Sequence, residues 1–375
     1  MLISGTLASD GPAHMMRLSY CLLILLATAI LCPGSFLDSD IPSYDSTPKS
    51  QQWMPRSQRV LPQPPPGRIS RLVDHCLVGR PYSYNGLTIY PVRLKRDLVQ
   101  GLYVTMDEGL AAGTLQIRET GKVARLEVIN RGRAPVFLLA GEIVVGGRQN
   151  RMVSNDVLIN AGDTVRVPVY CIEKGRWAGD VTGFVSAKTL GLPDFRELAG
   201  KSAAQDEVWR AVSEASRKVK VSSETEDFQK VYDHAPLRKQ LDTYKSRYRR
   251  LWRKPTAGIV VVRFGRIVGA DIFGNSAVFA ALRPKLLDSY ILDRLQYPDA
   301  VKRRKSFREP NAAQIREYLN TAKRATTNAV STPGRGRAFT LSDAANGTAL
   351  TINGDVLHLN LMGPPPVRIY RRVER

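Results

Sequence analysis

The feature that most constrains the fold is a series of short, alternating segments separated by turns between Leu87 and Glu173. ARLEVIN and TVRVPVYCIE carry apolar residues at every second position, and the turn sequences RGRAP and NAGD divide the series. A two-residue period is typical of β-strands that bury one face. In the longest segment that face carries Val165, Val167, Val169, Cys171 and Glu173. Several such strands with frequent turns predict a β-sandwich or partly closed barrel in residues 85–180.

Residues 200–375 combine helical and strand patterns. Apolar residues recur at helical spacing in 203–221, 236–252, 277–295 and 310–324. Two hairpins are also predicted, one with Gly265-Arg266 as a type II′ loop and one around Asn353-Gly354. Locally paired strands with helices in separate segments predict an α+β fold, formed by a single domain over residues 71–375.

The first 32 residues have the pattern of an export signal. Tyr20–Cys32 is an unbroken apolar run, shorter than the roughly 20 residues that a membrane-spanning helix needs, and Arg17 precedes it. Ala27-Thr28-Ala29 fits a cleavage site, while an uncleaved anchor or a lipoprotein attached through Cys32 are the alternatives. We therefore expect an exported protein, either periplasmic, extracellular or membrane-anchored through residues 20–32. The Pro-rich residues 33–70 are expected to form a linker.

The charge balance favours anionic partners. The chain has 55 Lys and Arg against 34 Asp and Glu, for a net charge of +21. Basic residues concentrate in 238–254 and 302–308, where a solvated helix surface and an anion-binding patch both remain open. No RNP, KH, zinc-finger, GxGxxG or Walker motif occurs. Four Cys are too few for a disulfide scaffold, and the four scattered His predict no metal site. The cofactor is left unknown.

The densest polar cluster lies between Leu138 and Val157. Glu142 lies between glycines, and Gly146-Gly147 allows a ligand to approach the backbone closely. The next four residues, Arg148, Gln149, Asn150 and Arg151, are two cations and two amides. Such groups bind phosphates and ribose hydroxyls, with Glu142 as an acid, a base or an orienting carboxylate. The alternative is a solvated β-turn in which Glu142 pairs with an Arg.

A second polar cluster spans Val169–Gly179. Cys171 and Glu173 share a strand face, and Arg176 and Trp177 follow a glycine. A nearby cation would activate Cys171 as a nucleophile, and the Trp177 ring would stack on a base or sugar. Core packing of both residues is the alternative. Because sequential strands are usually neighbours, we expect the two clusters to meet in space.

Two residues outside the clusters have structural interpretations. Asp271 follows Gly269-Ala270 at a predicted strand end, where a capping role is expected. His358 alternates with Leu357 and Leu359, so it is expected on the solvent-facing side of its strand.

The two clusters also resemble a known family. LAGEIVVGGRQNR and DVLINAGDTVRVPVYCIEKGRW, with the later GRIVGADIFGNSAVFAALRPKLLDSYILD, are similar to the bacterial ARG and rhodanese-phosphatase-superfamily-associated protein domain, where ARG means ADP-ribosylglycohydrolase. The resemblance runs from about Leu87 to the C-terminus and implies a role near ADP-ribosylation or nucleotide metabolism. The positions that it implies are Glu142, Cys171 and Glu173 as catalytic residues and Gly146, Gly147, Gln149, Asn150, Arg151, Arg176 and Trp177 as ligand-binding residues.

These patterns support two functional hypotheses. In the first, the protein is exported and its polar pocket binds a phosphorylated or ribosylated ligand, an anionic small molecule of the nucleotide or ADP-ribose type. Hydrolase or transferase chemistry on that ligand is left open. In the second, the protein is a noncatalytic binding or scaffold module of the envelope that uses its basic helical surface.

Overall fold

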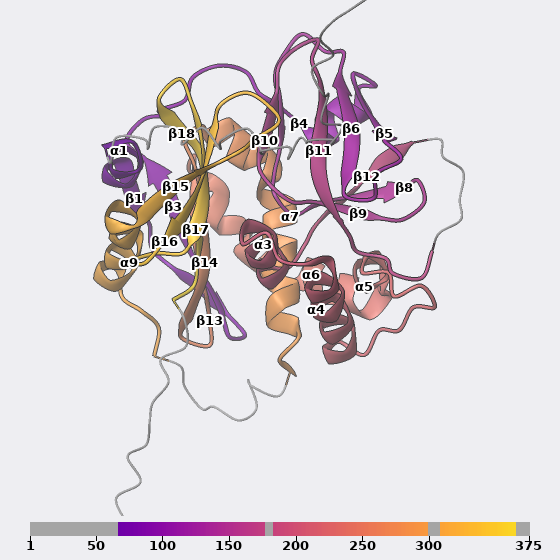
Figure 1. Cartoon of the computed structure of the whole chain (residues 1–375). Helices are drawn as coiled ribbons and strands as arrows, with labels where there is room; N and C mark the ends of the chain where they lie inside the picture. The colour runs from indigo at the N-terminus through magenta and orange to yellow at the C-terminus, as the bar shows by residue number, and fades with distance from the viewer. Residues whose placement is uncertain (1–66, 177–182, 299–307, 365–375) are drawn as a thin grey trace, which may run out of the picture. The chain divides into compact units, whose positions relative to one another are not determined.

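The computed structural model describes residues 67–176, 183–298 and 308–364 (Figure 1). These residues belong to one compact unit, Arg59–Arg375. The expected signal segment, residues 33–66 of the expected linker, Trp177 and residues 302–307 lie outside the described residues. Helix α1 begins at Gly67, so the last residues of the segment expected to be a linker are helical. No helix in the described ranges is long and apolar enough to cross a membrane.

A nine-stranded antiparallel sheet joins the two ends of the described chain. Its order is β1-β3-β13-β14-β18-β17-β16-β15, and β2 pairs with β3. The strands are β1 Cys76–Val78, β2 Tyr82–Tyr84, β3 Leu87–Leu94, β13 Gly258–Arg263, β14 Arg266–Phe273, β15 Thr326–Val330, β16 Arg337–Ser342, β17 Gly347–Ile352 and β18 Asp355–Met362.

The position of β3 corrects one expectation. This strand was expected in the β-rich first half, but it pairs with β13 instead. The reason is burial, since consecutive residues of both strands are buried on both faces. A strand that is apolar on both faces is stable only in the middle of a sheet that is covered on both sides.

The predicted partly closed barrel is confirmed as a six-stranded antiparallel sheet that curls into a half-barrel, ordered β12-β8-β9-β11-β6-β5. Its strands are β5 Leu115–Glu119, β6 Arg125–Asn130, β8 Glu142–Gly146, β9 Arg151–Val153, β11 Thr164–Cys171 and β12 Phe184–Leu190. A three-stranded sheet accompanies it, formed by β4 Val104–Thr105, β7 Val136–Leu138 and β10 Val157–Ile159. The alternation predicted for β11 is present, because Val167, Val169 and Cys171 are buried while the residues between them are partly exposed.

Helices fill the space between the two β structures and cover the outer face of the large sheet (Figure 1). They are α1 Gly67–His75, α2 Met106–Ala111, α3 Pro193–Gly200, α4 Gln205–Lys218, α5 Gln229–Asp233, α6 Ala235–Tyr248, η1 Arg249–Arg253, α7 Ser276–Leu295 and α9 Ala312–Arg324. The four helical segments expected from the sequence correspond to α4, α6, α7 and α9. The α+β class is therefore confirmed.

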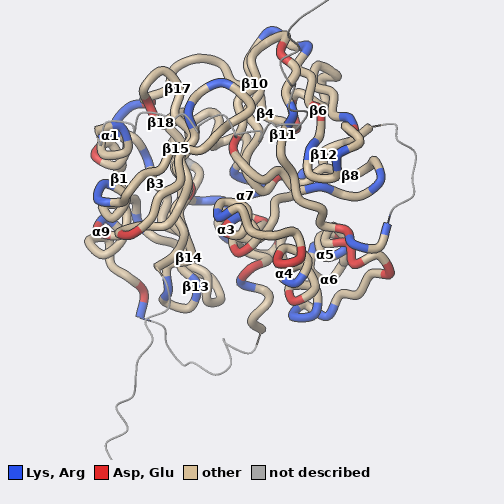
Figure 2. The backbone as a smooth tube through the Cα atoms, in the orientation of Figure 1, with Lys and Arg blue, Asp and Glu red and all other residues tan. Residues whose placement is uncertain are grey.

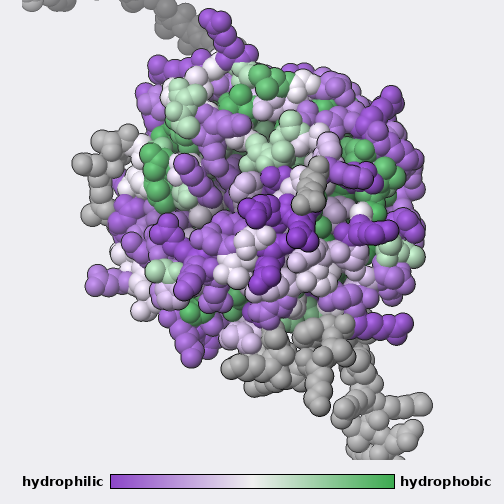
Figure 3. Space-filling model, turned by 180° about the vertical axis from the view of Figure 1, so that it is seen from behind, coloured by the Kyte–Doolittle hydropathy of each residue, from purple (hydrophilic) through white to green (hydrophobic). Residues whose placement is uncertain are grey.

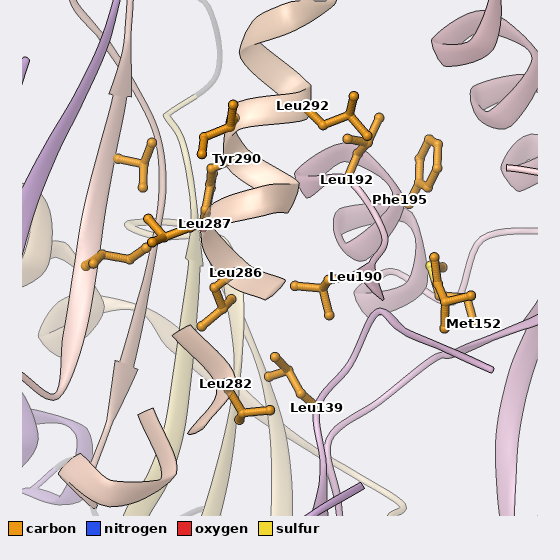
Figure 4. Packing of buried hydrophobic residues seen from close by; sticks show 14 of the residues in the cluster. Leu139, Met152, Leu190, Leu192, Phe195, Leu282, Leu286, Leu287, Tyr290 and Leu292 are labelled. Carbon is orange, nitrogen blue, oxygen red and sulfur yellow. The ribbon is translucent and has the colours of Figure 1, made fainter. Parts of the chain in front are cut away.

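Helix α7 lies between the large sheet and the half-barrel, and its side chains form the centre of the main core. Leu282 and Leu286 of α7 pack in the same cluster as Leu190, the last residue of β12 in the half-barrel, and Leu139, which follows β7 (Figure 4). On the opposite face of the large sheet, α1 and α9 cover a second cluster that includes Leu359. The central strands of the large sheet, such as β3 and β13, are thus buried on both faces.

Both hairpin turns consist of two residues with positive φ, although one turn was predicted one position away from where it lies. Phe264 and Gly265 form the first loop, with φ of 51° and 76°, between the paired residues Arg263 and Arg266. Positive φ at both positions defines a type I′ turn, so the expected Gly265-Arg266 type II′ turn is wrong by one residue. Asn353-Gly354, with φ of 50° and 97°, forms the turn expected from its sequence.

The surface seen from behind in Figure 3 is mainly hydrophilic, with small separate hydrophobic patches. Leu102 is an example of an exposed apolar side chain, with 76% of its surface accessible, whereas Leu286 is fully buried. Truncating Leu286 to Ala should lower the free energy of unfolding by about 2–5 kcal/mol, because it opens a cavity in the main core. Leu102→Ala should change that free energy by less than about 0.5 kcal/mol. Urea denaturation of both variants tests this, and equal losses would contradict the assigned core.

Candidate functional site

A polar pocket of about 200 Å³ lies where the half-barrel meets the large sheet. The segment Ser154–Asp156, between β9 and β10, lines one side. Helix α3 contributes Arg196, and strands of the large sheet contribute Thr340, Thr348 and Asn360. Ligand pockets occur preferentially at such junctions between structural units.

A buried charge network forms the floor of this pocket; it consists of Asp156, His358, Asp271 and Arg196. The His358 ring bridges the two carboxylates, with Nδ1 2.6 Å from Asp156 and Nε2 3.1 Å from Asp271. Arg196 donates from both terminal nitrogens to Asp271, one of them at 3.1 Å. All four residues are at most 7% exposed, and only Asp156 and Arg196 line the pocket.

Neutral side chains complete the coordination of Asp271. The Tyr290 hydroxyl donates to it at 2.8 Å, and the Asn360 amide donates at 3.0 Å. Asp156 also accepts the backbone N–H of Ala140 at 2.8 Å. Buried carboxylates need such partners, because an unpaired charge in the interior is strongly destabilising.

The network sets the protonation states of its members. Burial alone would lower the pKa of His358, but Asp156 and Asp271 raise it to about 9, so the imidazole is protonated at neutral pH. Burial would raise the pKa of Asp271, but Arg196 and His358 hold it far below its usual range. At neutral pH the network therefore places two cations, Arg196 and the protonated His358, against the carboxyl groups of Asp271 and Asp156.

Sheet register explains why these residues meet. Thr340 faces Thr348 across β16 and β17, Thr348 faces Asn360, and Asn360 faces Asp271. Directly opposed residues point to the same face of a sheet, so these side chains form one polar row across four strands. His358, two residues before Asn360, lies on that same face.

Two expectations are corrected here. His358 was expected to face solvent, but it is fully buried. Alternation correctly separated His358 from Leu359 and Leu361, but the face that it occupies is covered by the core around α7 rather than by water. Leu357 belongs to that same core, because the register of β17 and β18 shifts beside it. Asp271 was expected to cap a strand end, but it lies within β14 and accepts bonds from four side chains.

Glu142 lies in a different buried contact. Its carboxylate is 2.6 Å from Lys285 Nζ of α7 and accepts the Leu139 N–H at 2.8 Å. Lys285 also contacts Asp107 of α2 at 2.6 Å. Burial raises the pKa of Glu142, and Lys285 opposes that rise. The alternative of a solvated turn in which Glu142 pairs with an Arg does not describe this contact, because Glu142 is fully buried and its partner is Lys285.

Gly141 lies between the charge network around Arg196 and the ion pair of Glu142 with Lys285. Its φ is +97°, and a Cβ there would lie 2.7 Å from Arg196 Cγ. The conformation and the close approach both require glycine. The LAGE segment thus contacts Asp156 through Ala140, Arg196 through Gly141 and Lys285 through Glu142.

The two sequence clusters meet, as expected, because β9 pairs with β11 and places Arg151 opposite Cys171. Arg151 is 1% exposed and donates to Gln149 at 2.8 Å and to the Cys171 sulfur at 3.0 Å. Burial raises the pKa of the Cys171 thiol, which disfavours the thiolate that a nucleophile needs.

The remaining motif residues bind one another. Glu173 accepts the Asn150 N–H at 3.0 Å and two bonds from Arg176 Nε at 2.9 and 3.0 Å. Arg176 also donates to Gly147 O at 2.8 Å. A Cβ at Gly146 would lie 2.4 Å from Gly183 O, so the glycines allow β12 to approach closely. This motif therefore fastens the 146–151 segment to the end of β11.

The pocket contains residues that the sequence patterns did not single out. Asp156 falls inside the first cluster but was not singled out, and Arg196 belongs to no motif. Lys285, the partner of Glu142 outside the pocket, lies in the family-like segment GRIVGADIFGNSAVFAALRPKLLDSYILD but was not singled out either. A lysine among the apolar residues of 277–295 was the available signal for Lys285, because an unpaired charge is not tolerated in a buried helix. No group of His, Cys, Asp and Glu suited to a metal ion occurs in ranges 67–176, 183–298 and 308–364.

Comparison with protein families gives one match. The model of the ARG and Rhodanese-Phosphatase-superfamily-associated Protein domain matches residues 75–362, which is more than half of the chain. No curated protein and no solved structure matches.

The contact between Glu142 and Lys285 should contribute strongly to stability. Glu142→Gln removes the main counter-charge of a lysine that is 3% exposed, and should lower the free energy of unfolding by about 3 kcal/mol. Glu224→Gln, at an exposed position, should have almost no effect. Chemical denaturation measures both, and a neutral Glu142→Gln would contradict a structural ion pair.

The charge network predicts a pH-dependent stability. The pKa of His358 is about 9 in the folded protein against the ordinary 6.5, so the folded state binds this proton more tightly. The contribution to stability should be complete below pH 6.5 and should be lost as the pH rises through about 9, by about 3 kcal/mol. Unfolding free energies across this range should show the decline in the wild type and in His75→Gln. If the His358→Gln variant loses the same amount of unfolding free energy over this pH range, the titration of another group causes the loss.

Proposed function

Because the chain belongs to the ARG and Rhodanese-Phosphatase-superfamily-associated Protein domain family, we propose that its pocket binds the ribosyl group of a ribosylated small molecule. The name of the family associates it with ADP-ribose-related enzymes, and this supports an ADP-ribose-related role. The observation that carries the proposal is the charge network beneath the pocket. Removing two carboxylates and two cations from water lowers the stability of the fold relative to apolar residues of similar volume in the same place. Their presence therefore favours a functional role.

The balance of charge favours a sugar over a bare phosphate. Arg196, the cation that lines the pocket, is bound by Asp271 through both terminal nitrogens. Asp156 presents a carboxylate that already accepts two hydrogen bonds, and a carboxylate has about four acceptor sites. Ligand hydroxyl groups can donate to the remaining sites, whereas a phosphate would be repelled by the carboxylate.

The polar row supplies the rest of the binding surface. Thr340, Thr348 and Asn360 stand side by side on adjacent strands, about 4.8 Å apart, and all three line the pocket. Hydroxyl and amide groups can donate and accept hydrogen bonds, as recognition of a ribose requires. Rigid strands hold them in place, which limits the entropy lost on binding.

Hydrolysis or transfer at the ribosyl carbon is the catalytic form of this proposal. In such a reaction the oxygen of a water or alcohol forms a bond to the ribosyl carbon, while the bond to the leaving group breaks and the leaving group departs with the bonding electron pair. A base must accept the proton of the attacking oxygen, and Asp156 is the pocket carboxylate suited to this role. His358, protonated at neutral pH, keeps a positive charge beside Asp156. Asp271 is enclosed and bound on all sides, so its role is to hold His358 and Arg196 in position.

Export remains part of the proposal. The apolar run at residues 20–32 and the Pro-rich segment after it support a periplasmic, extracellular or membrane-anchored location. The ligand would then be met outside the cytoplasm.

The basic helical surface supports the alternative role as an envelope binding module. Figure 2 shows Lys and Arg gathered at α6 and the segment that follows. Lys245 pairs there with Asp242 and Asp288, while Arg249 and Arg250 are exposed. Binding to an anionic polymer through these residues would weaken with salt. It would not depend on Asp156.

Adenosine, a ribosyl compound without phosphate, tests the proposal on the full chain. The wild type should bind it, and Asp156→Asn should weaken binding by about tenfold or more, because a charge-assisted hydrogen bond is lost. Asp163→Asn, which changes an exposed carboxylate in the turn before β11, should bind as the wild type does. Calorimetric titration gives the affinities, and chromatography of the ligand shows whether it is cleaved.

A second variant separates binding from damage to the charge network. Thr348→Val removes one hydroxyl of the pocket and leaves all four charged residues in place. It should weaken adenosine binding while the melting temperature changes little. Unchanged affinity in both Asp156→Asn and Thr348→Val would show that the ligand does not bind in this pocket.

A further inference from the structure

The pocket continues into a groove along α3. A neighbouring pocket of about 370 Å³ shares Gly200, Ser202, Thr340 and Thr348 with the first one. A third, of about 640 Å³, shares Glu197, Lys201 and Asn346 with the second. The three pockets therefore adjoin one another between α3 and the large sheet, and together they are called the groove. A single ribose would fill only the first section.

The electrostatic character changes along this groove. The first section is lined by hydroxyl and amide side chains such as Thr340, Thr348 and Asn360, by apolar residues such as Phe339, and by Asp156 and Arg196 of the charge network. The third section contains Lys201, Arg263 and Arg266, together with the carboxylates Asp194 and Glu197. The polar end and the cationic end thus suit different chemical groups.

Two of the three cations are accessible to a ligand. Arg263 is held by the buried Asp293 and stacks on Tyr297 at 4.3 Å, so it is fixed in place. Lys201 forms a surface pair with Glu197 and its side chain is 59% exposed. Exposed pairs of this kind contribute about 0–1 kcal/mol and exchange partners at little cost. Arg266 is exposed at the start of β14.

We propose that the groove binds the phosphate or pyrophosphate group of the same ligand, with Lys201 and Arg266 as its binding residues. This rests on the proposed function, since it requires the ribosyl group to occupy the first section. The ligand class is then a ribose joined to a diphosphate, extended along α3 from Asp156 toward the β13–β14 hairpin. Lys and Arg are the side chains that bind phosphates through charge-assisted hydrogen bonds.

The test compares ADP-ribose with adenosine on the full chain by calorimetric titration. The wild type should bind ADP-ribose about tenfold or more tightly than adenosine, and the difference should shrink as salt is raised. The double variant Lys201→Gln/Arg266→Gln should lose this advantage and bind adenosine as the wild type does. The matched control Lys239→Gln/Arg210→Gln removes two exposed cations of α6 and α4, and should keep it.

The outcomes separate this proposal from the one on which it rests. If adenosine and ADP-ribose bind equally, and the double variant changes neither affinity, the groove binds no phosphate while the ribosyl pocket stands. If the control loses as much affinity as the double variant, general surface charge explains the preference and the proposal is wrong. If neither compound binds, the ribosyl pocket is wrong and this proposal falls with it.

Discussion

The burial of α7 between two β structures is the constraint on which the rest of the molecule depends. One side of this helix contacts the large sheet and another contacts the half-barrel, so its leucines belong to the largest core cluster. A helix enclosed in this way must satisfy every polar group that it carries. Lys285 and Tyr290 meet that requirement by reaching Glu142 on one side and Asp271 on the other. Helix α7 therefore contacts both the Glu142 ion pair and the charge network around Asp271, and it fixes their relative positions.

The charge network lies where the two β structures are joined, and this location gives it two roles. It links Asp156, beside the half-barrel, to His358 of the large sheet, and His358 in turn contacts Asp271 on the neighbouring strand. It also leaves one carboxylate at the wall of a pocket. Buried ionic groups are a weak source of stability compared with apolar packing. This is why we propose ligand recognition as the reason for their presence in a junction pocket.

The motif that carries the family resemblance acts mainly as a frame around this site. Hydrogen bonds join its residues to each other: Arg176 donates to Glu173 and to Gly147 O, and Arg151 donates to Gln149. These bonds hold the ends of β9 and β11 together. LAGE, at the start of the same motif, is the part that reaches the pocket, through Ala140 and Gly141. A dense run of polar residues in a sequence can thus mark the support of a site rather than its contact surface.

Local physics in the sequence determined the elements, whereas the identity of the pocket was decided only by tertiary structure. The alternation in β11, the helical spacing of α4, α6, α7 and α9, and the Asn353-Gly354 turn depend on neighbouring residues, so they could be predicted. Alternation also separated His358 from Leu359, but it could not show the register shift that places Leu357 in the core around α7, or whether the face of His358 meets water or a second layer. Asp156, Arg196, Asp271 and His358 come from four distant segments, and only the pairing of β14 with β18 and the packing of α3 against the sheet bring them within hydrogen-bonding distance. A one-dimensional pattern records side-chain period and local conformation, but it does not record which distant surfaces cover each other.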